Sequence, residues 1–216
     1  MTKRFQAVIW DFGGVFTSSP FEAFNRYEAE KGLPADFIRS VNAVNPLENA
    51  WAKLERSLIG AEEFDGLFRA EAQAMGHDVR GKEILALLSG SLRPRVVNAL
   101  KVCKQHGKVG CITNNAPIGK GASMTEDDDR ASELAGVFAL FDHLIESSKI
   151  GIRKPDPRIY ALMCETLGVD PAACVYLDDL GINLKPARDM GMATIKVTGE
   201  EQLLADLEAV TGYAVR

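Results

Sequence analysis

The chain has 216 residues, of which 46% are hydrophobic and 25% are charged, and its formal net charge is −5. This composition indicates an ordinary globular protein with a sizeable core, and the acidic balance argues against a nucleic-acid partner. No apolar run is long enough to span a membrane, and residues 1–5 lack the apolar stretch of a signal peptide. We therefore expect a cytoplasmic protein.

The cysteines and histidines of the chain indicate which kinds of site we do not expect it to contain. The four cysteines form no CxxC pair, so we expect buried, reduced thiols. The three histidines show no metal-ligand spacing, which argues against a zinc site and against a Ser-His-Asp triad.

The N-terminal part of the chain changes character after one strand. Residues 5–11 form an apolar run, which predicts a strand buried on both faces. From about residue 17 to 91 the hydrophobic residues recur at helical spacing, which predicts an inserted all-helical cap. The helices expected there are Pro20–Glu30, Pro34–Asn42, Pro46–Leu58, Ala61–Met75 and Lys82–Leu88.

From about residue 92 the pattern alternates between helices and strands. This alternation indicates a parallel sheet with right-handed crossovers. We predict an α/β fold, in which residues 1–16 and 92–216 form a Rossmann-like core and residues 17–91 form the cap. The expected strands are Val109–Thr113, His143–Glu146, Cys174–Asp178 and Ala193–Val197; the expected helices are Arg93–His106, Asp129–Leu140, Pro157–Leu167, Asn183–Met190 and Glu200–Thr211.

Asp11 is the most informative residue. It ends the first apolar run and is followed, after one residue, by Gly13 and Gly14. Glycines allow the backbone to approach a ligand closely, and a carboxylate at a strand end lies at the lip of the sheet. This arrangement predicts a ligand-binding carboxylate.

Later segments carry complementary groups. Thr113 and Asn114 follow one predicted strand, Lys154 lies in a loop, and Asp178 and Asp179 follow another strand. Ligands of open parallel sheets bind beyond the carboxyl ends of the strands, so we expect these groups to converge. A nucleophile, a hydroxyl, a cation and a carboxylate pair suit phosphoryl chemistry on a divalent metal.

A phosphate monoester is a dianion, so a metal must neutralise charge before an anion can attack it. Mg²⁺ prefers oxygen ligands. The Asp11 side chain, the Gly13 backbone carbonyl and one carboxylate of Asp178 or Asp179 could supply these oxygens.

Asp11 would attack phosphorus and form an aspartyl-phosphate that water hydrolyses. Lys154 and the Thr113 hydroxyl would hold the phosphoryl oxygens, and the backbone amides of the Gly13–Gly14 turn would add donors.

These segments resemble motifs I to IV of the haloacid dehalogenase superfamily of hydrolases. The motifs are Asp11–Val15, Thr113–Asn114, Ser148–Pro157 and Asp178–Asp179. The segment 175–192 resembles the N-terminal phosphatase domain of soluble epoxide hydrolases and the related domain fused to some acyl-CoA dehydrogenases. The resemblance implies that Asp11 is the nucleophile and that Thr113, Asn114 and Lys154 bind phosphate. It also implies that Asp179 binds Mg²⁺ directly, while Asp178 orients Asp179 or Lys154.

One position departs from the usual pattern of the superfamily. Phosphatases that it resembles carry a second aspartate, a general acid and base, where this chain has Gly13. General acid–base help is typically worth about 10²–10⁴-fold. We expect a slow phosphatase, one restricted to good leaving groups such as acyl or sugar 1-phosphates, or one with a substitute acid.

Three alternatives stay open. A haloacid dehalogenase needs no leaving-group proton, but it would leave the acidic pair without a task. A phosphonatase-type hydrolase would use a cap lysine, for which Lys53 is the candidate. A non-catalytic, regulatory protein would keep only a phosphate pocket.

The cap should set substrate specificity by closing over the site and excluding water. Its candidate specificity residues are Phe16, Asn45 and Trp51, although aromatic residues at helical spacing often belong to a core. We expect a small phosphorylated metabolite as the partner, and exposed cap helices could form a homodimer.

Overall fold

The structure is a computed structural model that describes residues 5–88 and 90–216. Residues 1–4, used above to exclude a signal peptide, and residue 89, within the predicted cap, lie outside the described residues. Five parallel strands form one sheet in the order β3-β2-β1-β4-β5. The strands are β1 (Ala7–Trp10), β2 (Lys108–Thr113), β3 (His143–Glu146), β4 (Cys174–Asp178) and β5 (Ala193–Lys196). The predicted parallel α/β core is confirmed.

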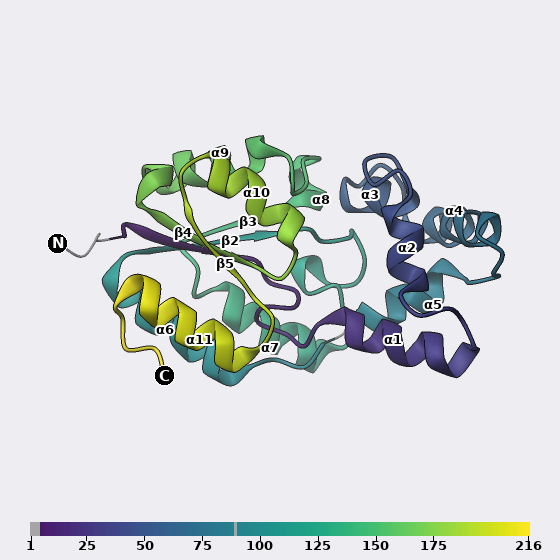
Figure 1. Ribbon diagram of the computed structural model, residues 1–216, viewed down its shortest axis with the longest axis horizontal. Helices are drawn as coiled ribbons and strands as arrows, with labels where there is room; N and C mark the ends of the chain where they lie inside the picture. Colours follow the sequence, from purple (N-terminus) through teal and green to yellow (C-terminus); the bar gives the residue numbers. More distant parts are fainter. Residues whose placement is uncertain (1–4, 89) are drawn as a thin grey trace.

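Strand β1 is the central strand because it pairs with β2 on one side and β4 on the other, and helices cover both of its faces. Its side chains alternate, so that Val8 and Trp10 join one core while Ala7 and Ile9 join the other. Helices α6 (Pro94–His106), α7 (Asp128–Phe138) and α11 (Glu200–Thr211) pack on the first face. Helices α9 (Pro157–Leu167) and α10 (Gly181–Asp189) pack on the second. Figure 1 shows these layers above and below the sheet.

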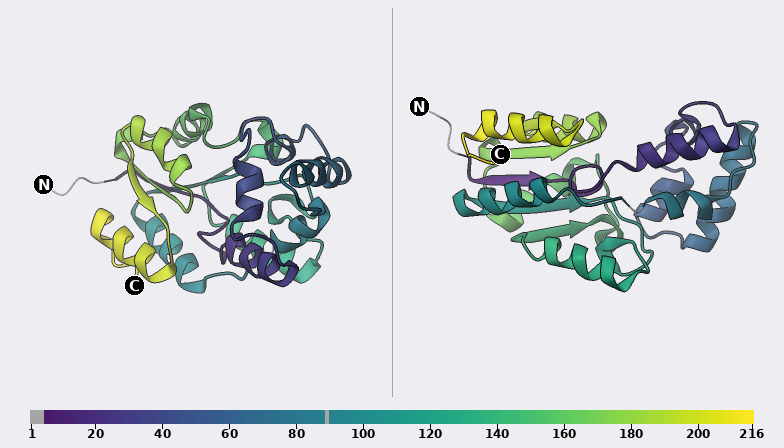
Figure 2. Two further views of the ribbon diagram at one scale, coloured as in Figure 1. Left: turned by 45° about the vertical axis from the view of Figure 1, so that its right-hand side comes forward. Right: turned by 90° about the horizontal axis from the view of Figure 1, so that it is seen from below.

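The helices between β1 and α6 lie beyond the carboxyl ends of the strands and enclose a separate hydrophobic core (Figures 1 and 2). They are α1 (Pro20–Lys31), α2 (Phe37–Ala43), α3 (Ala50–Glu55), α4 (Ala61–Ala74), α5 (Gly81–Leu85) and the 3₁₀ turn η1 (Ala86–Leu88). The two connections to the sheet run side by side, because Thr17 pairs with Leu92 in an isolated antiparallel bridge. We call this helical segment the cap and keep its limits, 17–91, as a prediction.

Local capping shortens one predicted helix. The segment 46–58 is helical only over α3, because the Asn49 side chain accepts a hydrogen bond from Ala52 N and starts the helix there. Ser57 adopts a positive φ of 56°, so the helix ends before it. The short helix α8 (Ser147–Ile150) and the 3₁₀ turns η2 (Gly121–Ser123) and η3 (Pro171–Ala173) were not predicted.

The structure bears on the predictions about the cysteines and about membrane-spanning segments. All four cysteines are buried and outside any disulfide, as expected. None of the described helices combines the length and the apolar character that crossing a bilayer requires.

Candidate active site

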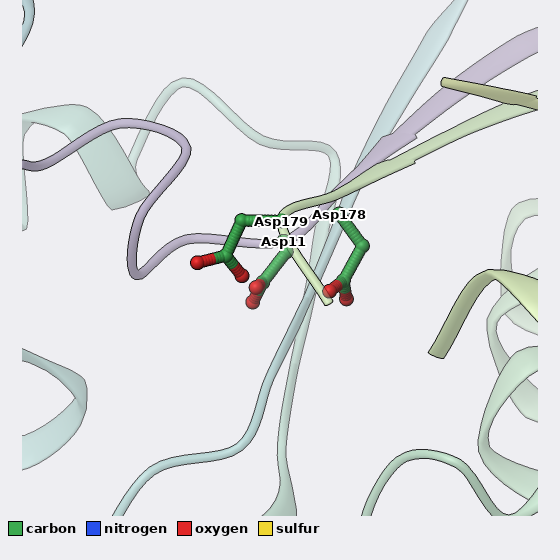
Figure 3. A group of neighbouring side chains, drawn as sticks. All are labelled: Asp11, Asp178 and Asp179. Carbon is green, nitrogen blue, oxygen red and sulfur yellow. The ribbon is translucent and has the colours of Figure 1, made fainter. Parts of the chain in front are cut away.

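Three aspartates meet at the carboxyl ends of β1 and β4. Asp11, Asp178 and Asp179 each offer a carboxylate oxygen within 4.8 Å of the others, and Figure 3 shows Asp11 between the other two. The parallel pairing of β1 with β4 produces this convergence, since it places Trp10 beside Leu177 one residue before both motifs.

Asp178 is held on all sides by protein donors. It accepts hydrogen bonds from the Tyr176 hydroxyl at 2.6 Å, from Leu180 N at 2.8 Å and from Asn183 Nδ2 at 3.0 Å. Lys154 Nζ lies 2.9 Å from its Oδ2. A carboxylate has about four lone-pair positions, so these donors leave Asp178 little capacity for a metal. Its contacts suit a residue that positions Lys154.

Lys154 is buried and joins the two strand ends. Its Nζ lies 2.6 Å from Asp11 Oδ1, which also accepts a hydrogen bond from Phe12 N. Burial and the nearby carboxylates of Asp178 and Asp179 raise the pKa of Asp11, and the Lys154 ammonium opposes that rise. Burial alone would lower the pKa of Lys154, but Asp11 and Asp178 raise it overall, so the side chain stays charged. Both of these contacts of the Asp11 side chain are made by Oδ1 and neither by Oδ2.

Asp179 lies against the glycine turn. Gly14 has a φ of +73°, and a Cβ there would overlap the Asp179 carboxylate. The turn therefore requires glycine for its backbone conformation and for the close approach. Burial and the charge of Asp178 raise the pKa of Asp179 to about 6.

The charges of this cluster fit a divalent cation. Three carboxylates face one ammonium, which leaves an excess of negative charge in a buried place. Mg²⁺ binds carboxylate and carbonyl oxygens, so Asp11 and Asp179 fit it, while Asp178 is occupied by other donors. The Gly13 carbonyl as a further ligand stays a prediction.

The two residues after β2 have different surroundings. Thr113 is buried at the strand end and lines the cavity described below. The Asn114 side chain is occupied by the backbone of Lys154, because its Oδ1 accepts from Lys154 N at 2.8 Å and its Nδ2 donates to Lys154 O at 3.0 Å. The amide thus fixes the Lys154 loop, and any contact of Asn114 with phosphate would fall to its backbone.

A cavity of about 500 Å³ lies between the sheet and the cap. The polar side chains at its sheet end are Asp11, Thr113, Asn114, Lys154 and Asp179, and Gly13 also lines it. Its cap end is mostly apolar and includes Pro20, Phe21, Phe24, Pro46, Leu47, Trp51 and Leu88. The polar side chains of Thr17, Arg39, Asn42 and Glu55 also line it.

The three residues predicted to set specificity, Phe16, Asn45 and Trp51, lie in different places. Trp51 lines the cavity. Phe16 is fully buried in the sheet core, where it packs on Trp10 and Phe141, so it is a core residue and not a cavity-lining residue. Asn45 is exposed and absent from the lining, while its neighbour Pro46 takes that place. Lys53, the residue that a phosphonatase would need, is also absent from the described lining.

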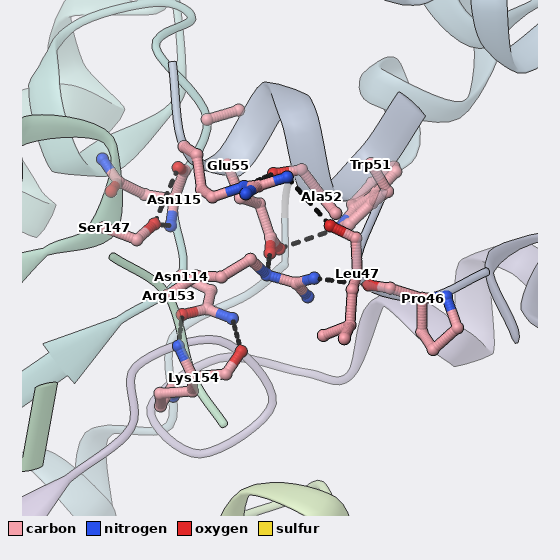
Figure 4. A network of polar contacts seen from close by, with 12 residues as sticks. Pro46, Leu47, Trp51, Ala52, Glu55, Asn114, Asn115, Ser147, Arg153 and Lys154 are labelled. Carbon is pink, nitrogen blue, oxygen red and sulfur yellow. Dashed lines mark hydrogen bonds and ion pairs between the residues drawn. The ribbon is translucent and has the colours of Figure 1, made fainter. Parts of the chain in front are cut away.

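Arg153 was missed by the sequence analysis and connects the site to the cap. Its Nε lies 2.6 Å from Glu55 Oε2, and its Nη1 donates to Pro46 O at 3.0 Å. Glu55 also accepts from Trp51 Nε1 at 2.8 Å (Figure 4). Its position next to Lys154 was the only signal in the sequence.

Arg93 was also missed. Its Nη1 donates to Gly14 O at 2.7 Å and to Val15 O at 3.1 Å, which holds the glycine turn in place. Its charge also lowers the pKa of Asp179, against the larger effects of burial and Asp178. Nothing in its sequence position marks this role.

The family model for haloacid dehalogenase-like hydrolases matches residues 5–191. The chain belongs to the haloacid dehalogenase-like hydrolase family. It is 34% identical over 204 residues to bifunctional epoxide hydrolase 2 of Mus musculus, a match that covers 88% of this chain and 36% of that protein. This chain therefore spans about a third of the length of that relative.

Two further comparisons cover nearly the whole chain. It is 26% identical over 220 residues to the sesquiterpene phosphatase astK of Aspergillus oryzae, covering 98% of this chain and 100% of that protein. A family enzyme from Bacteroides thetaiotaomicron, solved with magnesium and inorganic phosphate, has a TM-score of 0.57 and 22% identity. That match covers 91% of this chain and 96% of the other, and it confirms the fold.

Proposed function

We propose that this hydrolase is a magnesium-dependent phosphatase that acts on a small phosphorylated metabolite with an apolar organic part. The observation that carries the proposal is the contact of 2.6 Å between Asp11 and Lys154, beside Asp179, at the polar end of an apolar cavity. The phosphate would occupy the polar end, and the organic part would contact the cap.

The reaction has two displacements at phosphorus. Asp11 Oδ2 attacks, the bond from phosphorus to the ester oxygen breaks, and that oxygen leaves with the electron pair. Water then attacks phosphorus, the bond to Asp11 breaks, and inorganic phosphate and the free carboxylate are released. Lys154, already beside Asp11, and Thr113 would hold the phosphoryl oxygens. When bound by Asp11 and Asp179, Mg²⁺ supplies charge neutralisation for the approach of the carboxylate.

Two observations support an apolar substrate. The cap end of the cavity is mostly hydrophobic and includes the aromatic side chains Phe21, Phe24 and Trp51. Such a surface gains about 25 cal/mol for each Å² of apolar area that it removes from water. A relative of the same length is named as a sesquiterpene phosphatase, and a sesquiterpene is an apolar group.

The test is a panel of phosphate esters assayed with Mg²⁺ and with EDTA. We expect turnover with Mg²⁺, loss of turnover in EDTA, and no turnover by Asp11→Asn. Asp189→Asn, on the exposed end of α10, is the matched control and should keep activity. Full activity of Asp11→Asn would remove Asp11 as the nucleophile.

Other outcomes of the panel would favour the alternatives. Phosphate binding without turnover of any ester would indicate a non-catalytic phosphate-binding protein. Halide release from haloacids that EDTA does not affect would indicate a dehalogenase, in which the acidic pair has no evident task.

Location and assembly belong to the same proposal. Buried thiols outside any disulfide support a cytoplasmic location. The exposed cap side chains Val44, Leu47 and Leu58 support a homodimer through the cap, which light scattering would test.

A further inference from the structure

Gly13, two residues after Asp11, leaves open space at the polar end of the cavity. A Cβ built at Gly13 has no neighbouring atom within 4 Å, and the backbone there is not in the left-handed region. Gly14 differs, because a Cβ at that position would overlap the Asp179 carboxylate. The fold could therefore accept a carboxyl side chain at position 13, but the chain supplies none.

The other carboxyl groups of the cavity have different tasks. Among the described residues that line it, the carboxyl groups are Asp11, Asp179 and Glu55. Asp11 and Asp179 belong to the nucleophile and the metal site. Glu55 is paired with Arg153 at 2.6 Å and accepts a hydrogen bond from Trp51 Nε1 at 2.8 Å, so its carboxylate serves to join the cap to the Arg153 loop.

The remaining titratable groups do not replace the acid. The described lining includes no histidine, cysteine or tyrosine. Lys154 Nζ lies between Asp11 and Asp178, at 2.6 and 2.9 Å, and it is the group that would hold the phosphoryl oxygens. Guanidinium groups of arginine do not deprotonate in proteins. Among the described residues that line the cavity, no side chain is therefore free to serve as the acid for the leaving oxygen.

The apolar lining restricts the leaving group in a second way. A sugar hydroxyl group brought against Phe21, Phe24 and Trp51 would lose hydrogen bonds to water that these three side chains do not replace. An aryl, enol or acyl group satisfies both conditions, since its oxygen departs as a stabilised anion and its body is apolar.

We infer that the substrate carries its phosphate on an aryl, enol or acyl oxygen of an apolar molecule, an inference that rests on the proposed phosphatase function. In the first step the bond from phosphorus to this oxygen breaks, the oxygen keeps the electron pair, and the anion diffuses away and equilibrates with water. In the second step the attacking water loses its proton to solvent. Because no side chain serves as its base, phosphorylated Asp11 accumulates during turnover.

The experiment measures kcat/KM for phenyl phosphates that differ in one ring substituent, with apolar alkyl phosphates of similar size for comparison. At fixed pH and saturating Mg²⁺, we expect kcat/KM to fall steeply as the leaving alcohol becomes less acidic. Alkyl phosphates should react at least about 10²-fold more slowly than matched aryl phosphates.

Two variants at one position separate acid catalysis from packing. Gly13→Asp adds an acid in the open space and should raise kcat/KM for the poor leaving groups by about 10²–10⁴-fold, which flattens the dependence. Gly13→Asn adds almost the same volume without the acid and should keep the steep dependence. Intact-mass measurement of quenched wild-type protein should show a phosphorylated population.

A shallow dependence in the wild-type enzyme, with alkyl and aryl phosphates hydrolysed alike, would overturn the inference while leaving the phosphatase function in place. Equal flattening by Gly13→Asp and Gly13→Asn would also overturn it. If either variant fails to fold, the wild-type series decides the question alone. Failure of the wild-type enzyme to hydrolyse any ester or acyl phosphate would instead remove the proposed function.

Discussion

Removal of divalent metal should destabilise this protein at neutral pH and have little effect in acid. Burial and Asp178 raise the pKa of Asp179 to about 6 from an ordinary value of 3.8. The folded state thus binds this proton more tightly than the unfolded state does. The corresponding stability is fully present below about pH 4 and is lost as the pH rises through about 6. Asp11, whose pKa is also raised, acts in the same direction.

The magnitude follows from the shift of Asp179. A rise of about two pKa units corresponds to about 3 kcal/mol, since one unit is worth about 1.4 kcal/mol. For a chain of this size, 1 kcal/mol changes Tm by roughly 2–4 °C, so the loss is about 6–12 °C. Bound Mg²⁺ should reverse it, because a cation stabilises the ionised carboxylates that burial and mutual repulsion disfavour.

The assay compares thermal unfolding of the wild-type protein and Asp179→Asn, in EDTA and in Mg²⁺, at about pH 4 and about pH 8. The difference between the two proteins isolates Asp179 from every other titrating group. In EDTA at the higher pH, Asp179→Asn should be the more stable protein, and Mg²⁺ should stabilise it less than it stabilises the wild type. The reasoning is refuted if both proteins change in parallel between the two pH values, or if Mg²⁺ stabilises both equally.

Three other substitutions, with Gly13→Ala as a control for one of them, test the contacts around this cluster. Lys154→Met should cost the metal-free protein at least about 3 kcal/mol in urea unfolding, because two buried carboxylates lose their partner. Gly14→Ala should lower the free energy of unfolding by about 1–3 kcal/mol and weaken Mg²⁺ binding, which calorimetry measures. Gly13→Ala should show no comparable loss of stability, because a Cβ at that position meets open space. Arg153→Gln should raise KM more than it lowers kcat, because it releases Glu55 on the cap. It should also lower the free energy of unfolding by about 1–3 kcal/mol. An unchanged KM would exclude a role of Arg153 in holding the cap.

The sequence predicts the sheet and its polar edge well because buried parallel strands leave little freedom. The apolar run before Asp11 allows only a central strand, and the residue after its end must lie at the edge where Thr113 and Asp179 also lie. By contrast, the contact of Arg153 with Glu55 depends on how two separately folded segments dock. No periodicity in either segment carries that information.

Side-chain tasks were harder to predict than positions. Asn114 follows its strand as expected, yet its amide is used by the Lys154 backbone. Phe16 looked like a cap residue from its place after the glycine turn, but the chain leaves the core only after Phe16 has been buried against Trp10. The contacts of Asn114 depend on its side-chain rotamer, and those of Phe16 depend on where the chain leaves the core. Hydrophobic patterns in the sequence determine neither.

The neighbouring pair Asp178 and Asp179 shows how far the pattern can be taken. Side chains alternate along a strand, so Asp178 shares a face with Tyr176, whose ring belongs to the core beneath α9 and α10. The hydroxyl of Tyr176 can then reach Asp178, and the observed distance is 2.6 Å. Asp179 must turn away from that core and toward the glycine turn, where Gly14 makes room for it. Alternation, together with the Tyr176 contact and the space at Gly14, thus separates the carboxylate that contacts Lys154 from the one that faces the glycine turn.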